Sequence, residues 1–297
     1  MTMRRPLAIL AMALCSASIG AQNLDKVQIK TEKLSETSYM LTGAGGNLGL
    51  SVGEDAVFLV DDQYAPMSSK IRAAVAAISK KPVKFVVNTH WHDDHTGGNE
   101  ALGKNDTVIV AHENVRKRMS TGQLVEFLGN NVKPFPKVAL PVVTFTRDVS
   151  FHLNGDEISV VHVPSAHTDG DAFVHFKKDN VVHMGDLFFN KLYPFIDTSS
   201  GGRVEGVIAA VDLVLARTND ATRFIPGHGP LASKADLVAY RSMLETISGR
   251  IRAMTLEGKT LEQVIAAKPT ADFDPVWGKG FLPPARFTEM VYKNLKR

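Results

Sequence analysis

Three histidines and two aspartates fall within six positions at residues 90–95 (HWHDDH). Neutral imidazole nitrogens and carboxylate oxygens are the usual protein ligands of zinc and similar divalent ions. A looped backbone would point His90 and His92 one way and Asp94 and His95 another, an arrangement that serves two metal ions. A polar loop that happens to be rich in histidine is the alternative interpretation, and the sequence around the motif favours the metal site.

The residues on either side of the motif place it at the end of a strand. An apolar, β-branched run at 85–87 lies in a segment, 83–89, that is typical of a buried strand. Gly97 and Gly98 follow the motif, where the chain must turn before a short helix expected at 99–102. The predicted strand therefore delivers the motif to one edge of a sheet.

Three later polar residues, His167, Asp186 and His228, have the same placement just past an apolar strand. Loops at one edge of a rigid scaffold are where distant side chains can converge. Each residue is ordinary by itself, but together with the first motif they indicate one shared site. The strands that precede them are expected at 158–163, 181–184 and 223–226.

The predicted elements run as strands then helix, and then strands then helix again. The turn at 43–47 is expected to be a hairpin connection, the segment 123–128 a loop or short helix, and Asn154-Gly155 a tight hairpin. Two β-rich halves with helices outside predict an α/β fold, a four-layer αββα sandwich. The helices are expected at 66–79, 112–119, 204–216, 235–254, 260–267 and 281–295.

Residues 1–21 have the layout of a secretory signal peptide. Arg4 and Arg5 precede an apolar run at 7–14, and small residues follow at 16–21, where we expect cleavage. The segment is too short to span a bilayer as a mature anchor, so it predicts a periplasmic protein with no stable membrane span. Lipid attachment at its cysteine is the alternative, which the bulky preceding leucine disfavours.

The rest of the chain, 22–297, is expected to be one domain, with a core at about 27–252 and a helical extension at 253–297. Its composition, 44% hydrophobic and 22% charged over the whole chain, is ordinary for a globular protein. Loss of the two leader arginines leaves 32 of the 34 basic residues against 31 acidic ones. Near-neutral charge argues against a nucleic-acid partner, and loss of the single cysteine excludes a thiolate ligand.

The ordered set of motifs resembles the metallo-β-lactamase superfamily of metal-dependent hydrolases over about 27–252. The resemblance implies the same αββα fold, a supporting role for Asp61 beneath the metal loop, and an all-nitrogen-and-oxygen site because Asp186 stands where some relatives have cysteine. His183 is a further candidate to support Asp186, since metal sites need such partners. The implied sites are His90, His92 and His167 for one ion, Asp94, His95 and His228 for the other, and Asp186 as the bridge.

The resemblance also implies the chemistry. We expect two zinc ions, with iron or manganese possible, and a hydroxide shared by the ions as nucleophile, oriented by Asp94. The expected substrate is a small cyclic amide, lactone or ester. A glyoxalase II-like thioesterase or a phosphodiesterase is the alternative within the family, and a non-catalytic metal-binding or sensing protein is the alternative outside enzymes.

Four side chains near the motifs are candidates for contact with the substrate. Lys191, Tyr193 and Arg203 could bind a substrate carboxylate, and their alternative roles are solvated surface charge and packing. Trp91 either walls the pocket or packs beneath the metal loop. The expected partner is a small molecule, and the sequence predicts no particular oligomeric state.

Overall fold

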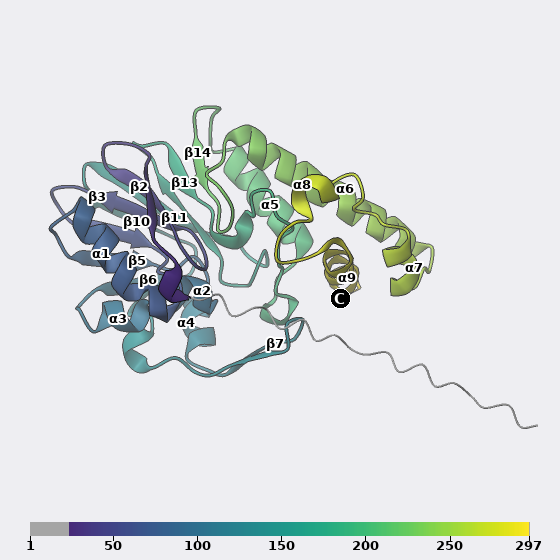
Figure 1. Ribbon diagram of the computed structural model, residues 1–297, viewed down its shortest axis with the longest axis horizontal. Helices are drawn as coiled ribbons and strands as arrows, with labels where there is room; N and C mark the ends of the chain where they lie inside the picture. The colour runs from purple at the N-terminus through teal and green to yellow at the C-terminus, as the bar shows by residue number, and fades with distance from the viewer. Residues whose placement is uncertain (1–23, 297) are drawn as a thin grey trace, which may run out of the picture.

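The structure, a computed structural model, describes residues 24–296 (Figure 1). The expected signal peptide at 1–21 lies outside the described residues. Two sheets of seven and five strands form the body of the molecule. Within 24–296, none of the helices combines the length and the apolar character that a membrane crossing needs.

The first sheet is built by the first half of the chain. Its first four strands pair antiparallel, and the fourth strand and the three that follow it pair in parallel. Parallel strands end at the same edge, so the loops after β4, β5 and β6 lie side by side. In spatial order the strands are β1 (Lys30–Lys33), β2 (Ser38–Thr42), β3 (Leu48–Val52), β4 (Val57–Val60), β5 (Val83–Val87), β6 (Val108–His112) and β9 (Val143–Phe145).

The second sheet contains strands from the second half. It is antiparallel except for its last pair, and it opens with the hairpin predicted at Asn154-Gly155, whose φ angles of 57° and 68° suit a tight left-handed turn. In order, the strands are β10 (Asp148–Leu153), β11 (Asp156–His162), β12 (Ala172–Phe176), β13 (Val181–His183) and β14 (Arg223–Ile225).

Alternating side chains divide the core into layers, as the αββα prediction requires. Phe58 of β4 points between the sheets and meets Phe176 of β12, whereas Leu59 points outward to α1 (Ser68–Ile78). On the other sheet, Ile225 of β14 faces the space between the sheets and Phe224 faces the outer helices. Figure 1 shows α1 and α3 (Asn99–Gly103) on one side of the sheets and α5 (Val204–Leu215) and α6 (Lys234–Leu256) on the other.

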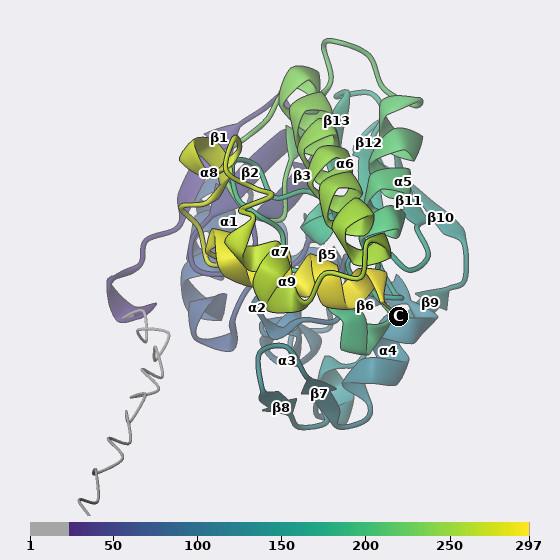
Figure 2. The ribbon, with the colours of Figure 1, turned by 90° about the vertical axis from the view of Figure 1, so that its right-hand side faces the viewer.

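The remaining helices pack at the ends of these layers. α7 (Leu261–Ala266) begins with the capping box expected at Thr260, and α9 (Pro284–Leu295) lies across the end of α6 (Figure 2). Phe287 of α9 stacks on Tyr193 with ring centroids 4.4 Å apart, which ties the C-terminal segment to the loop before α5. The other helices are α2 (Asp93–Thr96), α4 (Glu113–Met119) and α8 (Asp274–Trp277).

One local prediction is wrong. The segment expected as a loop or short helix at 123–128 instead starts a small hairpin, in which β7 (Gln123–Val125) pairs antiparallel with β8 (Asn130–Val132). Each strand has only three residues, too few for a visible alternation, and Gly129 makes the turn at φ 68°. We call residues 123–132 the lid hairpin because they border the cavity described below.

Candidate metal centre

Asp61, at the end of β4, holds the metal loop from beneath. Its carboxylate accepts hydrogen bonds from the Thr89 amide and hydroxyl, both at 2.8 Å, and lies 2.7 Å from His95 Nδ1. Asp61 and the loop that follows β5 are adjacent because β4 and β5 are parallel neighbours. This buried carboxylate thereby joins the two ends of the 89–95 segment, which is the place that the sequence resemblance gives it.

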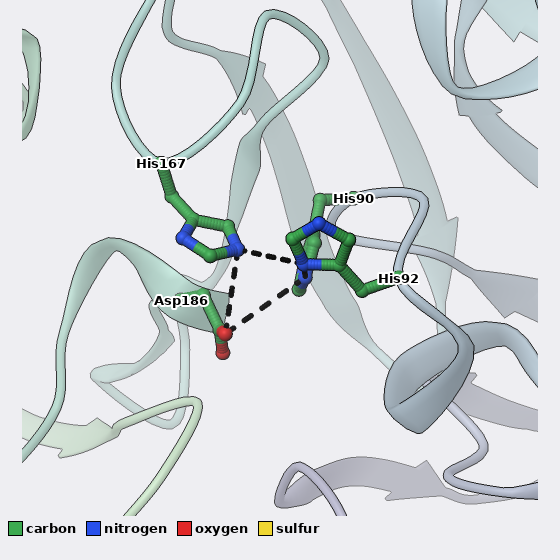
Figure 3. A group of neighbouring side chains, drawn as sticks. All are labelled: His90, His92, His167 and Asp186. Atoms are coloured by element: carbon green, nitrogen blue, oxygen red, sulfur yellow. Dashed lines mark hydrogen bonds and ion pairs between the residues drawn. The ribbon is translucent and has the colours of Figure 1, made fainter. Parts of the chain in front are cut away.

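His90, His92 and His167 converge on one point (Figure 3). His90 Nε2 lies 3.1 Å from His92 Nδ1, which in turn lies 2.9 Å from His167 Nε2. His90 and His92 come from the loop between β5 and α2, and His167 comes from the loop after β11. The ligand nitrogens of a tetrahedral zinc ion, each about 2.0–2.1 Å from it, lie about 3.3 Å apart.

The outer partners of these rings assign their tautomers. His167 Nδ1 faces the Phe195 carbonyl at 2.8 Å and must donate to it, so its Nε2 carries no proton when the ring is neutral. His92 Nε2 donates in the same way to the Asp197 carboxylate at 3.1 Å. The Thr89 hydroxyl gives its proton to Asp61 and accepts from His90 Nδ1 at 3.1 Å.

Three unprotonated nitrogens therefore face one another, an arrangement that repels unless a cation lies among them. Burial and the neighbouring histidines lower the pKa of His90, and burial lowers that of His167 to about 4, so both rings are neutral at pH 7. Neutral imidazoles with aligned lone pairs are the donor set that zinc prefers. The residues fit a metal ion on their chemistry as well as on their spacing.

A second cluster lies beside the first and consists of Asp94, His95, Asp186 and His228. His95 Nε2 is 3.0 Å from Asp186 Oδ1 and 3.6 Å from Asp94 Oδ2, and His228 Nε2 is 3.4 Å and 3.3 Å from the same two atoms. Potential ligand atoms of His95, Asp186 and His228 all lie within 4.8 Å of one another. The same holds for His90, Asp94 and His95.

Asp186 belongs to both clusters. Its Oδ2 lies 3.5 Å from His167 Nε2 and 3.8 Å from His90 Nε2. Its Oδ1 is buried, and the Nε2 atoms of His95 and His228 lie 3.0 Å and 3.4 Å from it. Burial by itself would raise the pKa of Asp186, but the four surrounding histidines hold it well below the usual value. A buried, ionised carboxylate among four imidazoles is a further sign of a cation site.

The same charges act on the other members of the second cluster. Burial opposes protonation of His228, but Asp186 and Asp94 outweigh it and raise the pKa of His228 to about 9. Burial likewise opposes ionisation of Asp94, and His95 and His228 nevertheless lower its pKa to about 2. Protons on imidazole thus balance the two carboxylates, and a divalent ion would replace these protons.

Glycines bring backbone close to the clusters at positions where a side chain would collide. A Cβ at Gly227 would lie 2.1 Å from Asp186 Oδ1, and one at Gly46 would lie 2.1 Å from the His95 ring. The expected hairpin connection at 43–47 does join β2 to β3, and it also packs against the second cluster. Sequence reasoning gave this glycine-rich turn no part in the site.

Asp197 is the functional residue that sequence reasoning missed. Its carboxylate accepts from His92 and from the amides of Ser199 at 3.0 Å and Ser200 at 3.2 Å. Burial opposes its ionisation, yet His92 and the serine donors lower its pKa well below the usual range. The signal available in the sequence was an aspartate followed by Thr-Ser-Ser, a pattern that favours a side chain bound to the next amides.

The residues considered for substrate contact lie in different settings. Tyr193 is buried beside the cavity, and its hydroxyl donates to Asp274 Oδ1 at 2.8 Å. Lys191 and Arg203 are exposed and do not belong to the described cavity wall. His183 is buried with its Nε2 3.0 Å from the Asn47 carbonyl, and its Nδ1 accepts from the amide of Gly185, so it supports the backbone next to Asp186.

A cavity of about 380 Å³ opens onto the clusters. Trp91 forms part of its wall while donating from Nε1 to Ser200 Oγ at 3.1 Å, so it both walls the cavity and packs beneath the loop. The lid hairpin and Phe281 also border the cavity. The lining comprises Gly45, Tyr64, Trp91, His92, Asp93, Asp94, Val125, Leu128, Asn130, Val132, Asp186, Phe189, Leu192, Tyr193, Phe195, His228 and Phe281.

The chain has the architecture of the αββα metallohydrolases. In this class two facing sheets lie between outer helices, and histidines and aspartates gather at one edge of the sheets. Within that class, a family model described as the metallo-beta-lactamase superfamily matches residues 42–229, and the chain belongs to this superfamily. It is a metal-dependent hydrolase in the broad sense that the superfamily defines. The resemblance and the fold predicted from the sequence are confirmed.

Individual relatives are distant. A metallo-beta-lactamase type 2 of Elizabethkingia meningoseptica is 27% identical over 185 residues, which cover 58% of this chain and 68% of that protein. A hydroxyacylglutathione hydrolase of Polaromonas sp. (strain JS666 / ATCC BAA-500) is 24% identical over 192 residues, 62% of this chain and 65% of that protein. A solved metallo-beta-lactamase from Pontibacter korlensis superposes with a TM-score of 0.60 at 21% identity, covering 73% of this chain and 99% of its own.

Proposed function

We propose that this hydrolase holds two zinc ions and opens a small cyclic amide, lactone or ester. The observation that carries the proposal is the set of histidine ring nitrogens that face one another at 2.9 and 3.1 Å beside a carboxylate common to both clusters. Iron or manganese would also suit these nitrogen and oxygen donors. One ion would be held by His90, His92 and His167 and the other by Asp94, His95 and His228, with Asp186 between them.

When bound, the metal ions would lower the pKa of a water molecule and polarise the carbonyl group of the substrate. Asp94 stays ionised at neutral pH and borders the cavity, so it can accept a hydrogen bond from the attacking water and orient it. Asp61 and Asp197 fix the rings of His95 and His92 from behind, so that the free nitrogen of each ring keeps its direction.

A thioesterase is the second candidate, because the relative from Polaromonas is a hydroxyacylglutathione hydrolase. The same donors and the same cavity would serve a thioester, whose carbonyl carbon is attacked in the same way. A phosphodiester is the third candidate, and it differs in placing a tetrahedral phosphorus atom where the other substrates have a carbonyl carbon. A panel of substrates separates these possibilities directly.

We also propose that the protein works in the periplasm. The support is the layout of residues 1–21, with Arg4 and Arg5 before an apolar run and small residues. Fractionation of cells that express the full chain, followed by mass measurement, should find a protein that starts near residue 22. Full-length protein confined to the cytoplasm would contradict the proposal.

The experiment that tests the activity uses purified protein loaded with zinc. It is assayed against a chromogenic cephalosporin, a lactone, an aryl ester, a thioester and a phosphodiester. We expect hydrolysis of at least one lactam, lactone or ester, loss of that activity in Asp186→Ala, and retention in Asp212→Ala, whose carboxylate pairs with Arg241 on the surface. Absence of turnover by the metal-loaded wild type across the panel would leave a non-catalytic metal-binding protein.

A further inference from the structure

We propose that the substrate carries an uncharged apolar group of several carbon atoms, which packs against the lid hairpin and Phe281 while the bond to be cut lies over the metal clusters. This inference rests on the proposed hydrolase function and specifies its substrate class. It disfavours compounds that place a carboxylate at the outer wall of the cavity, as a substrate recognised by Lys191 or Arg203 would.

The cavity has two chemically different parts. Its floor is formed by the imidazole and carboxylate groups of His92, Asp94, Asp186 and His228. Its outer wall is mostly apolar, with Asn130 as the polar member of the lid hairpin, and comes from segments far apart in the chain. That wall contains Val125, Leu128 and Val132 of the lid hairpin, Phe189, Leu192 and Phe195 of the loop after β13, and Phe281 before α9.

Phe281 is the most informative member of this wall. It is 55% exposed although it lines the cavity, so a large part of its ring can still be covered by a bound molecule. Leu128 of the lid hairpin belongs to the same lining and is half-buried. Burying apolar surface between such side chains is favourable by about 0.8 kcal/mol for each methylene group, which corresponds to about fourfold in affinity.

The hairpin is held in place to form this wall. Arg286 of α9 donates to the Phe127 carbonyl at 3.1 Å, and its guanidinium group lies 4.2 Å from the centroid of the Phe127 ring. Glu289 pairs with the same guanidinium at 2.5 Å. A wall anchored to the C-terminal helix can present a fixed apolar surface, which lowers the entropic cost of binding.

The charged side chains that line the cavity also favour a substrate whose outer group is uncharged. Besides the four floor residues, the charged group among the described lining residues is the carboxylate of Asp93, exposed at the mouth. A carboxylate on the substrate's outer part would lie mostly among apolar side chains, where Asn130 is the polar member of the lid hairpin in the lining. An anion there loses more water than one amide group replaces, which weakens binding.

The test is a series of p-nitrophenyl esters with the leaving group kept constant. With zinc-loaded protein, we expect kcat/KM to rise from acetate to butyrate to hexanoate by about twofold to fourfold per methylene. The monoester of glutaric acid, which ends in a carboxylate, should be slower than butyrate by about fivefold or more. A flat or falling series, or a preference for the glutarate ester, would overturn the inference while leaving the hydrolase function intact.

Two variants locate the effect. Phe281→Ala should flatten the dependence on chain length, lowering kcat/KM for the hexanoate ester more than for the acetate ester. Val276→Ala is the matched control, because Val276 is 51% exposed and does not belong to the described lining. If kcat/KM depends on chain length equally in Phe281→Ala and in the wild type, Phe281 does not belong to the proposed wall and the inference is contradicted.

Failure of the proposed function is recognised separately. If the zinc-loaded protein hydrolyses none of the esters, binding of 1-butanol, 1-hexanol and 1-octanol is followed by tryptophan fluorescence, since Trp91 lies in the cavity wall. Affinity that rises with chain length in the wild type and is weakened in Phe281→Ala supports the apolar site without any turnover. Affinity that is independent of chain length overturns it.

Discussion

Asp197→Asn removes the charge from the carboxylate that orients His92. In the wild type this side chain is buried, ionised and 3.1 Å from His92 Nε2. An asparagine keeps the shape, but it can present an amide nitrogen to His92 and no longer requires the Nε2–H tautomer. The free Nδ1 atom that faces His90 and His167 is then less available to a metal ion.

The loss of metal affinity in Asp197→Asn can be estimated from the role of carboxylates that orient metal-binding histidines. Loss of a carboxylate behind a metal-bound histidine weakens metal binding by about 10–100-fold, or about 1.4–2.8 kcal/mol. Asp61→Asn is the matched variant, because it makes the same chemical change behind His95. We therefore expect each variant to weaken one of two zinc sites and to spare the other.

Competition with a chromophoric chelator measures both dissociation constants, and circular dichroism checks that the variants fold. The expected outcome is two sites in the wild type, with one site weakened in Asp197→Asn and the other in Asp61→Asn. If Asp197→Asn leaves both constants unchanged, the tautomer argument for His92 is wrong.

Three further predictions concern stability and the lid. His112 and His162 stack with ring centroids 3.7 Å apart, and burial lowers both pKa values. As the pH falls below about 6.5, these histidines therefore take up protons in the unfolded chain before they do so in the folded protein. The free energy of unfolding then falls by up to about 1.4 kcal/mol per pH unit for each histidine. Urea unfolding at several pH values should show a smaller dependence on pH in His162→Gln. Arg286→Ala frees the lid hairpin and should raise KM for the hexanoate ester with little change in kcat, whereas Arg241→Ala on the surface of α6 should change neither. Phe58→Ala empties a buried position between the sheets and should cost about 3–5 kcal/mol in urea unfolding without altering zinc stoichiometry.

The layers and the metal clusters were predictable because their signals are local and repeated. Apolar strands that end in His, Asp or Gly-Asp mark the edge of a sheet, and β5, β13 and β14 lie close to their expected bounds. The role of Asp61 was implied by the resemblance, and in the structure the parallel pairing of β4 and β5 brings Asp61 next to the metal loop.

Features that depend on packing between distant segments were not predictable. Asp197 meets His92 across 105 positions of sequence, and nothing near either residue indicates the contact. The lid hairpin has strands too short to show a period, and its place over the cavity depends on α9. Lys191 and Tyr193 were both candidates for contact with the substrate, but Lys191 is exposed and Tyr193 is buried against Phe287.

The most direct measurement is the metal content of the purified mature chain after incubation with zinc and removal of free ions. The arrangement of the two clusters predicts two zinc ions per chain in the wild type and loss of bound zinc in Asp186→Ala, whose carboxylate belongs to both clusters. A well-folded wild-type protein that retains no metal would contradict the account.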